Sequence, residues 1–208
     1  MKKTVILFMG MVCLQPVNAE VIKEYFDDGV LKAEINFRDG TSSANKWGIK
    51  EGLEKIYYNT ATLAYSVHYL DGLREGKMTW LDRAGHTLEE LHYKKGKLEG
   101  INTIFYVNGK IKSQVKYVED KKEGIKKEYF DTGVLALKVN YIHNKKEGIQ
   151  EEYFEDGQLY SKVMYKNNYK EGLKEWYDKK GKTVRTEFYK MDRPINVMKE
   201  VQKNNFKY

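Results

Sequence analysis

Apolar and polar residues alternate along short stretches of this chain. Between Leu135 and Tyr141, apolar residues occupy every odd position, while Ala136, Lys138 and Asn140 occupy the even ones. Because successive side chains of a β-strand point to opposite faces, this alternation predicts a strand with one apolar face.

A second strand-like stretch, residues 125–130, precedes this one. The two are joined by Asp131-Thr132-Gly133, which is typical of a hairpin turn because glycine adopts a positive φ without steric cost. Glycines recur at the same place along the chain, at Gly85, Gly109, Gly133, Gly157 and Gly181. The pattern therefore predicts a series of hairpins.

The hairpins recur at a fixed interval. The pair Glu-Gly is found every 24 residues, at Glu51-Gly52, Glu75-Gly76, Glu99-Gly100, Glu123-Gly124, Glu147-Gly148 and Glu171-Gly172. A constant period of this length indicates a repeat architecture. We predict an all-β fold, a single-layer antiparallel β-meander of 24-residue hairpin repeats, elongated and twisted.

The repeat array is expected to cover residues 20–190. Six full repeats begin at residue 51, and a degenerate first unit occupies residues 20–50, because residues 24–29 resemble residues 128–133. The longer spacing in this unit predicts an eight-residue loop within residues 38–50, where the composition is typical of a loop.

Three local features of the array are predicted. The Glu-Gly glycine is expected to form the return turn into the next hairpin. The turn containing Ala61, which lacks the glycine, is expected to be built differently. The repeats with Trp80 and Trp176 are expected to have an altered register or a bulge, because their turns are one residue longer.

Residues 191–208 lack the repeat. Ile195, Met198 and Val201 could share one face of a helix that starts near Asp192 and Pro194. Two interpretations remain open for this tail, a short helix that caps the last sheet edge and a tail without regular structure.

The N-terminus resembles a secretory signal peptide. Lys2 and Lys3 precede a ten-residue apolar run, and Val17-Asn18-Ala19 places small residues before Glu20. The run would cover about 15 Å as a helix, half of a bilayer core, which favours a cleaved signal over a membrane anchor. A lipoprotein signal at Cys13 is the weaker alternative. We therefore expect residues 1–19 to be removed and the chain to be exported to the periplasm, the cell surface or the medium.

Composition then limits the function classes. Removing Lys2 and Lys3 from the 37 basic residues leaves 35 against 30 acidic ones, a formal charge of +5. Glutamates are interspersed among the lysines, whereas a nucleic-acid-binding surface would cluster its basic residues. We therefore expect no nucleic-acid partner. With Cys13 removed, the chain would contain no cysteine and no thiolate chemistry.

The repeated phrases "KEGIKKEYFDTGVLALKVNY" and "KEGIQEEYFEDGQLYSKVMY" resemble the bacterial variant, type 2, of the MORN repeat. The resemblance extends over about residues 20–190. It implies a non-enzymatic scaffold that binds proteins or membrane lipids. Some bacterial members are described as antitoxins and others as lipid-kinase-like, but this sequence contains no kinase motif.

Residues that could support chemistry are few. His68 and His92 share one repeat position, about 9.6 Å apart, which is too far for two ligands of one metal ion. The repeated glutamates are better explained by solvated turns with Lys or Arg beside them than by catalysis. We therefore expect no enzyme activity, no catalytic residue, no metal site and no cofactor.

One column of residues is a candidate partner-binding surface. A tyrosine occupies the same position in all six repeats, at Tyr69, Tyr93, Tyr117, Tyr141, Tyr165 and Tyr189. Two interpretations remain open for it. The tyrosines could stabilise the sheet by packing beside the valines two residues earlier, or they could form an exposed strip that binds a partner.

These observations favour an exported, non-enzymatic scaffold of the cell envelope that binds a protein partner. One alternative is an antitoxin or immunity-type protein that neutralises a toxin. A further alternative is a peripheral adapter that binds anionic membrane lipid through its net positive charge.

Overall fold

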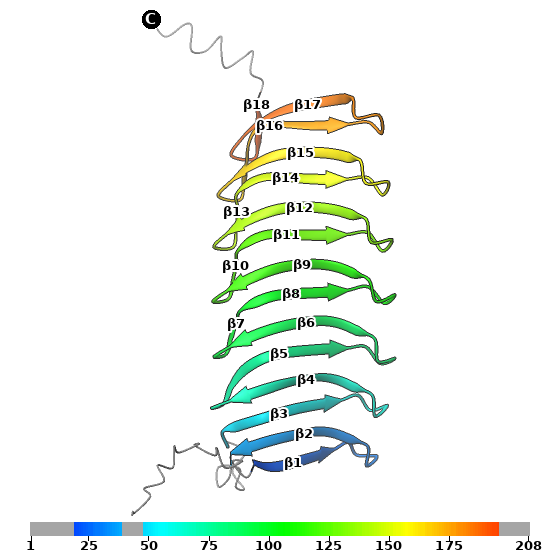
Figure 1. The fold of residues 1–208 in the computed structure, drawn as a ribbon, viewed down its shortest axis with the longest axis vertical. Helices are drawn as coiled ribbons and strands as arrows, with labels where there is room; N and C mark the ends of the chain where they lie inside the picture. The colour runs from blue at the N-terminus through cyan, green and yellow to red at the C-terminus, as the bar shows by residue number, and fades with distance from the viewer. Residues whose placement is uncertain (1–18, 39–47, 196–208) are drawn as a thin grey trace, which may run out of the picture.

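The protein is a single open antiparallel sheet whose strands follow one another in chain order as a meander. The structure is a computed structural model, and it describes residues 19–38 and 48–195. The hairpins stack along the longest axis of the molecule, so that the array is elongated (Figure 1). The predicted fold class is therefore confirmed.

Seven hairpins make up the described array. The first two are β1 (Ala19–Tyr25) with β2 (Leu31–Arg38), and β3 (Lys50–Tyr57) with β4 (Leu63–Leu70). The next three are β5 (Leu73–Leu81) with β6 (Thr87–Lys94), β8 (Gly100–Phe105) with β9 (Ile111–Val118), and β11 (Gly124–Tyr129) with β12 (Leu135–Ile142). The last two are β14 (Gly148–Tyr153) with β15 (Leu159–Lys166), and β16 (Tyr169–Tyr177) with β17 (Thr183–Lys190).

Four short strands lie beside the return turns, on the side of the stack where one hairpin leads into the next. They are β7 (Lys97–Leu98), β10 (Lys121–Lys122), β13 (Lys145–Lys146) and β18 (Arg193–Ile195). Each pairs with the end of the preceding strand, as Lys146 does with Tyr141. Figure 1 shows β7, β10 and β13 together at this side of the stack.

The Glu-Gly pair does not form the return turn, so that prediction is wrong. Glu123 lies between β10 and β11, and Gly124 is the first residue of β11, so the pair interrupts one arm of the hairpin. The return turn begins two residues after each tyrosine of the column, at pairs such as His143-Asn144, both of which have positive φ. Two residues with positive φ define the tight turn that suits the twist of antiparallel strands.

The turn containing Ala61 is built like the others, which corrects the second prediction. Tyr58 N–H donates to the Thr62 carbonyl at 2.8 Å, and Ala61 N–H donates to the Tyr58 carbonyl at 3.0 Å. Ala61 adopts a φ of 62°, in the region that glycine occupies in the other hairpin turns. The sheet therefore imposes the turn geometry even where the residue does not favour it.

The repeats with Trp80 and Trp176 contain the predicted bulge, but they share it with the ordinary repeats. In these hairpins the pairing shifts between Trp80 and Leu81 and between Trp176 and Tyr177, as it does between Glu128 and Tyr129 in an ordinary repeat. Their turns begin with an aspartate. Asp82 Oδ1 accepts backbone hydrogen bonds from residues 84 and 86, and Asp178 Oδ1 from residues 180 and 182, which stabilise a turn of unchanged length.

The regular structure continues past the predicted end of the array. Met191-Asp192 forms a further return turn with positive φ, and Arg193–Ile195 pairs with β17. Asp192 and Pro194 therefore do not start a helix, because Asp192 lies in a turn and Pro194 in a strand. Met198 and Val201, the predicted loop residues 39–47 and the predicted signal residues 1–18 lie outside the described residues.

The core lies on one face of the sheet, called the inner face here. Val67, Val139 and Val163 are only 1–2% exposed, and Val115 is also buried. Each is cross-strand from a residue of the preceding strand of its hairpin, as Val139 is from Lys126. A column of valines running through successive hairpins therefore replaces the compact core of a globular domain.

Candidate binding faces

The tyrosine column lies on the inner face, beside the valine column. Tyr69, Tyr141 and Tyr165 are 8–9% exposed, and Tyr93, Tyr117 and Tyr189 are half-buried. Desolvation by burial raises the pKa of Tyr117 and of Tyr165. This burial supports the packing interpretation of the column. Binding through these tyrosines remains a prediction.

Basic side chains lie over the tyrosine rings. In five repeats the ammonium or guanidinium group of a Lys or Arg lies 4.7–5.5 Å from the ring centroid of the tyrosine nineteen positions later, namely Lys50 over Tyr69, Arg74 over Tyr93, Lys122 over Tyr141, Lys146 over Tyr165 and Lys170 over Tyr189. This is the geometry of a cation–π contact. Desolvation by burial lowers the pKa of Lys146, whose side chain is half-buried.

The repeated glutamates have a structural role that the sequence did not reveal. The Oε2 atom of each accepts a backbone N–H from the first residue of the next return turn at 2.7–3.1 Å. The six pairs are Glu51 with Asp71, Glu75 with Lys95, Glu99 with Glu119, Glu123 with His143, Glu147 with Asn167 and Glu171 with Met191. The basic residue preceding the glutamate lies over a tyrosine instead of forming the expected turn ion pair in five of the six repeats. The glutamate column is therefore a set of turn caps.

The opposite face, called the outer face here, presents an exposed aliphatic column. It consists of the residues that follow the Glu-Gly pairs, Leu53, Ile101, Ile125, Ile149 and Leu173, together with Val21 at the same position of the first hairpin. These six side chains are 39–55% exposed. Lys77 interrupts the column in the second full repeat. Such a run of exposed apolar side chains at one repeat position is typical of an interaction surface.

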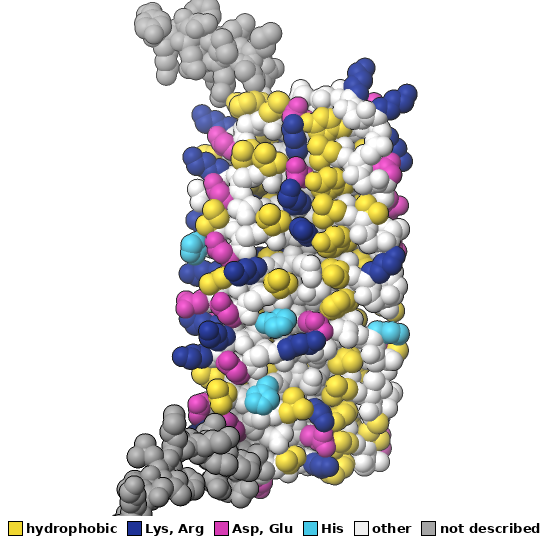
Figure 2. All heavy atoms as spheres, in the orientation of Figure 1, with side chains coloured by type: hydrophobic (Ala, Val, Ile, Leu, Met, Phe, Trp, Pro, Cys, Tyr) yellow, Lys and Arg dark blue, Asp and Glu magenta, His cyan; other side chains and the backbone are white. Residues whose placement is uncertain are grey.

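A row of ion pairs runs along the middle of the outer face. Lys138 contacts Glu151 at 2.9 Å, and Lys162 contacts Glu175 at 2.9 Å, each pair joining two neighbouring hairpins. Hydrogen bonds from these lysines lower the pKa of Glu151 and of Glu175. Figure 2 shows hydrophobic side chains in columns along the stack, with Lys, Arg, Asp and Glu side chains between them.

The aliphatic column is visible in the sequence as a recurring residue type, but only the tyrosine column was predicted as a binding surface. The residue after Glu-Gly is aliphatic in five of six repeats. Alternation within a strand does not relate the face of this residue to that of the valines, because they lie on different strands, and it does not state which of the two faces is covered. The structure supplies that missing fact.

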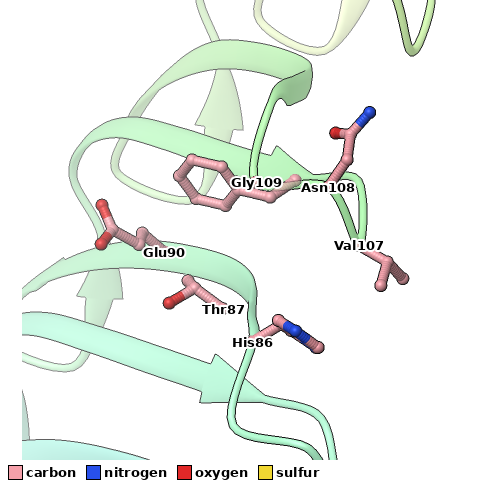
Figure 3. A pocket seen from close by; sticks show the side chains of 7 residues that line it. His86, Thr87, Glu90, Val107, Asn108 and Gly109 are labelled. Carbon is pink, nitrogen blue, oxygen red and sulfur yellow. The ribbon is translucent and has the colours of Figure 1, made fainter.

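The outer face also contains an open hollow at the hairpin-turn side, between β6 and β8. His86, Thr87, Glu90, Val107, Asn108 and Gly109 line it together with Phe105 (Figure 3). Thr87 occupies a position that is Leu or Ile in most other hairpins, and its smaller side chain leaves part of this space. Glu90 is bound by Lys77, and His86 Nδ1 lies 3.0 Å from Asp82 Oδ2, so both side chains already have partners.

The histidines do not gather into one site. His92 Nδ1 lies 2.7 Å from the Ile101 carbonyl oxygen, while His86 is held by Asp82 in a hairpin turn. Among residues 19–38 and 48–195, no group of three or more His, Cys, Asp or Glu side chains could hold a metal ion. Over the same ranges, no helix has the length and apolarity required to cross a membrane.

Comparison with known proteins agrees with this repeat geometry. The family model described as the MORN repeat variant matches residues 21–39, 98–119, 122–143 and 146–167. No curated protein matches the chain. One solved structure, a protein with unknown function from Bacteroides fragilis, is 9% identical over 84% of this chain and 96% of its own, with a TM-score of 0.14 that is too low to indicate a shared fold.

The four matched segments coincide with hairpins of the array. Residues 122–143 contain β11, β12 and the start of their return turn, and residues 146–167 contain β14 and β15. MORN repeats are generally non-catalytic and act in binding. The chain is a MORN-repeat protein, and its four matched repeats are of the variant type.

Proposed function

We propose that this chain is an exported, non-enzymatic scaffold of the cell envelope that binds a protein partner through the aliphatic column of its outer face. The aliphatic column is the observation that carries the proposal. Its six side chains, all of them Val, Leu or Ile, are 39–55% exposed to solvent. Removing such apolar surface from water stabilises a complex by about 25 cal/mol per Å².

The geometry of the column suits an extended partner surface. Equivalent residues of successive hairpins are separated by two inter-strand spacings, about 9.6 Å. Ile101, Ile125, Ile149 and Leu173 form the uninterrupted part of the column. The row of ion pairs beside it supplies a polar border, as is usual at protein–protein interfaces.

The export part of the proposal is supported by the N-terminal sequence. Lys2-Lys3, the apolar run and Val17-Asn18-Ala19 have the order of a secretory signal. The structure is compatible with cleavage before Glu20, since Glu20 to Tyr25 retain their pairing with β2. The absence of cysteine from residues 20–208 leaves no disulfide requirement for folding outside the cytoplasm.

A pair of matched variants tests the binding face. Ile125→Lys places a charge in the middle of the aliphatic column, whereas Val107→Lys places one at a hairpin turn, on a side chain that is 62% exposed. The partner is first identified by affinity capture from the envelope fraction of the host and then purified. Ile125→Lys is expected to weaken its binding at least thirtyfold, about 2 kcal/mol, and Val107→Lys less than threefold. Equal binding by wild type and Ile125→Lys would show that the column is not the interface.

A further inference from the structure

We propose that this protein assembles head to tail with copies of itself, β1 of one copy adding to β17 of the copy before it. Both strands lie at an end of the described sheet. Among residues 19–38 and 48–195, β1 pairs with β2 on one side, and β17 pairs with β16 on one side and with β18 at Phe188–Lys190 on the other. Exposed strand edges of this kind are templates for pairing with another chain.

The strands at the two ends are complementary because they are equivalent, by repeat position, to the two strands that pair at each internal junction between hairpins. Within the array, the second strand of each hairpin pairs with the first strand of the next, with Lys138 opposite Glu151 and Leu137 opposite Glu152. β17 is the second strand of the last hairpin, and β1 is the first strand of the first hairpin. The same register would place Thr186 opposite Lys23, and Arg185 opposite Glu24, of the next copy.

The ends also match in length. Arg193–Ile195 occupies the repeat positions of residues 145–147, the short strand and glutamate that precede β14. Glu20 pairs with Phe37 in the first hairpin, and Gly148, the first residue of β14, pairs with Tyr165 in its own hairpin. Since Phe37 and Tyr165 occupy the same repeat position, Glu20 and Gly148 do so too. β1 of a chain that starts at Glu20 would therefore lie along residues 183–187 of β17, the part of that edge that does not pair with β18. Only this starting point rests on the proposed export.

Side chains at the two ends have matching character. Val21 is 50% exposed and Phe188 is 39% exposed, and the register would place them near each other on the outer face. Glu24 and Arg185, which have opposite charges, would face each other on the inner face. Tyr25 and Val184, at the turn ends of the same two edges, are 57% and 61% exposed, so both edges leave large apolar side chains in water.

This contact joins two different surfaces of the chain and does not close on itself. A contact between unlike surfaces generates an open-ended assembly when its rotation does not form a ring. Since each junction would repeat the geometry of an internal junction, the assembly would continue the stack of hairpins from copy to copy. Its size should therefore depend on protein concentration without a limit at two copies.

Sedimentation velocity of the chain from Glu20 to Tyr208, over a range of concentrations, tests this assembly. The weight-average mass is expected to rise beyond that of two copies. Glu24→Arg and Arg185→Glu should each remain monomeric where the wild type assembles, a loss of at least tenfold in association, because each variant alone opposes like charges. An equal mixture of the two variants should assemble, because every junction then joins Arg to Glu.

The results that would overturn the proposal are distinct. They are a wild type that stays monomeric at all concentrations, a dimer that grows no further, or a variant mixture that stays monomeric. Circular dichroism melts of both variants verify that each is folded. Because the assay requires neither export nor a protein partner, its failure would leave the proposed function untouched, and loss of partner binding would leave the assembly untouched.

Discussion

The Oε2 atom of Glu123 accepts a hydrogen bond of 2.9 Å from the backbone N–H of His143, twenty residues further along the chain. His143 is the first residue of a return turn in which both residues have positive φ. The glutamate of one hairpin thus holds the turn that leads out of the same hairpin into the next. Five other glutamates make the equivalent contact.

Glu123→Ala should destabilise the array by about 1 kcal/mol, because the turn N–H loses a charged acceptor at a partly solvated site. Urea unfolding followed by circular dichroism measures the change. Glu155→Ala, at an exposed hairpin-turn position, is the matched control and should change the free energy of unfolding by less than about 0.5 kcal/mol. Equal effects of the two substitutions would contradict the capping role.

Tyr141→Ser should destabilise the array by about 3 kcal/mol, because Tyr141 is 9% exposed and truncating a buried aromatic side chain leaves a cavity. Tyr129→Ser, on a half-buried tyrosine nearer the hairpin turn, should cost less. Chemical denaturation measures both. If Tyr141→Ser leaves stability unchanged and abolishes partner binding, the tyrosine column is an interface after all.

Ala61→Gly should stabilise the array by about 0.5 kcal/mol. Ala61 has a φ of 62°, and relief of about 1–2 kcal/mol of left-handed strain exceeds the entropy that glycine gains in the unfolded chain. The reverse change, Gly133→Ala, should destabilise the array, since Gly133 has a φ of 93° in the equivalent turn. Thermal melts of the two variants should move in opposite directions.

Tyr65 should ionise later than an ordinary tyrosine. Burial, chiefly through desolvation, raises its pKa from 10 to about 12. The fold favours the neutral phenol, so the stabilisation is complete below the unfolded pKa near 10 and is lost as the pH rises through about 12. Ultraviolet difference titration of wild type and Tyr65→Phe measures this. The variant should lack one late-titrating phenol and should be less sensitive to alkaline unfolding between pH 10 and 12.

N-terminal sequencing of the protein from its host should give a chain that starts at Glu20. Val17 and Ala19 have the small side chains that signal cleavage requires. Ala19→Pro, next to the scissile bond, should block processing and leave a longer species that mass spectrometry detects. An intact Met1 on protein from the cytosolic fraction would refute export.

The architecture could be predicted because its periodicity is explicit. The interval between Glu51, Glu75 and the later glutamates fixes the repeat, and alternation around Val139 fixes which residues share a face. The position of the return turns could not be derived this way. Asn144 and Asp192 adopt positive φ without a glycine to signal it, so the return turns were placed at the more conspicuous Glu-Gly pairs.

The candidate site was harder to predict than the fold. Tyr141 and Ile125 are both apolar residues of one hairpin, and Gly124, which precedes Ile125, pairs with Tyr141. Propensity gives no reason to bury one more than the other. The difference arises from tertiary contacts, since Lys122 lies over the Tyr141 ring at 5.5 Å while Ile125 remains 50% exposed. The recurrence of the tyrosine therefore leaves packing and partner binding both open, whereas the structure shows that the more variable aliphatic position is the exposed one.

The hydrogen bonds that join successive return turns span 20 or 22 residues, as in Glu123 with His143 and Lys146 with Asn168. In the described part of the array, each hairpin is thus tied to its immediate neighbours, as is typical of repeat proteins. Length is consequently an adjustable quantity in this molecule. Gain or loss of one 24-residue segment would change the distance between the two ends by about 9.6 Å and leave every remaining junction intact. The distance that the array spans can therefore be set in fixed steps by the number of repeats.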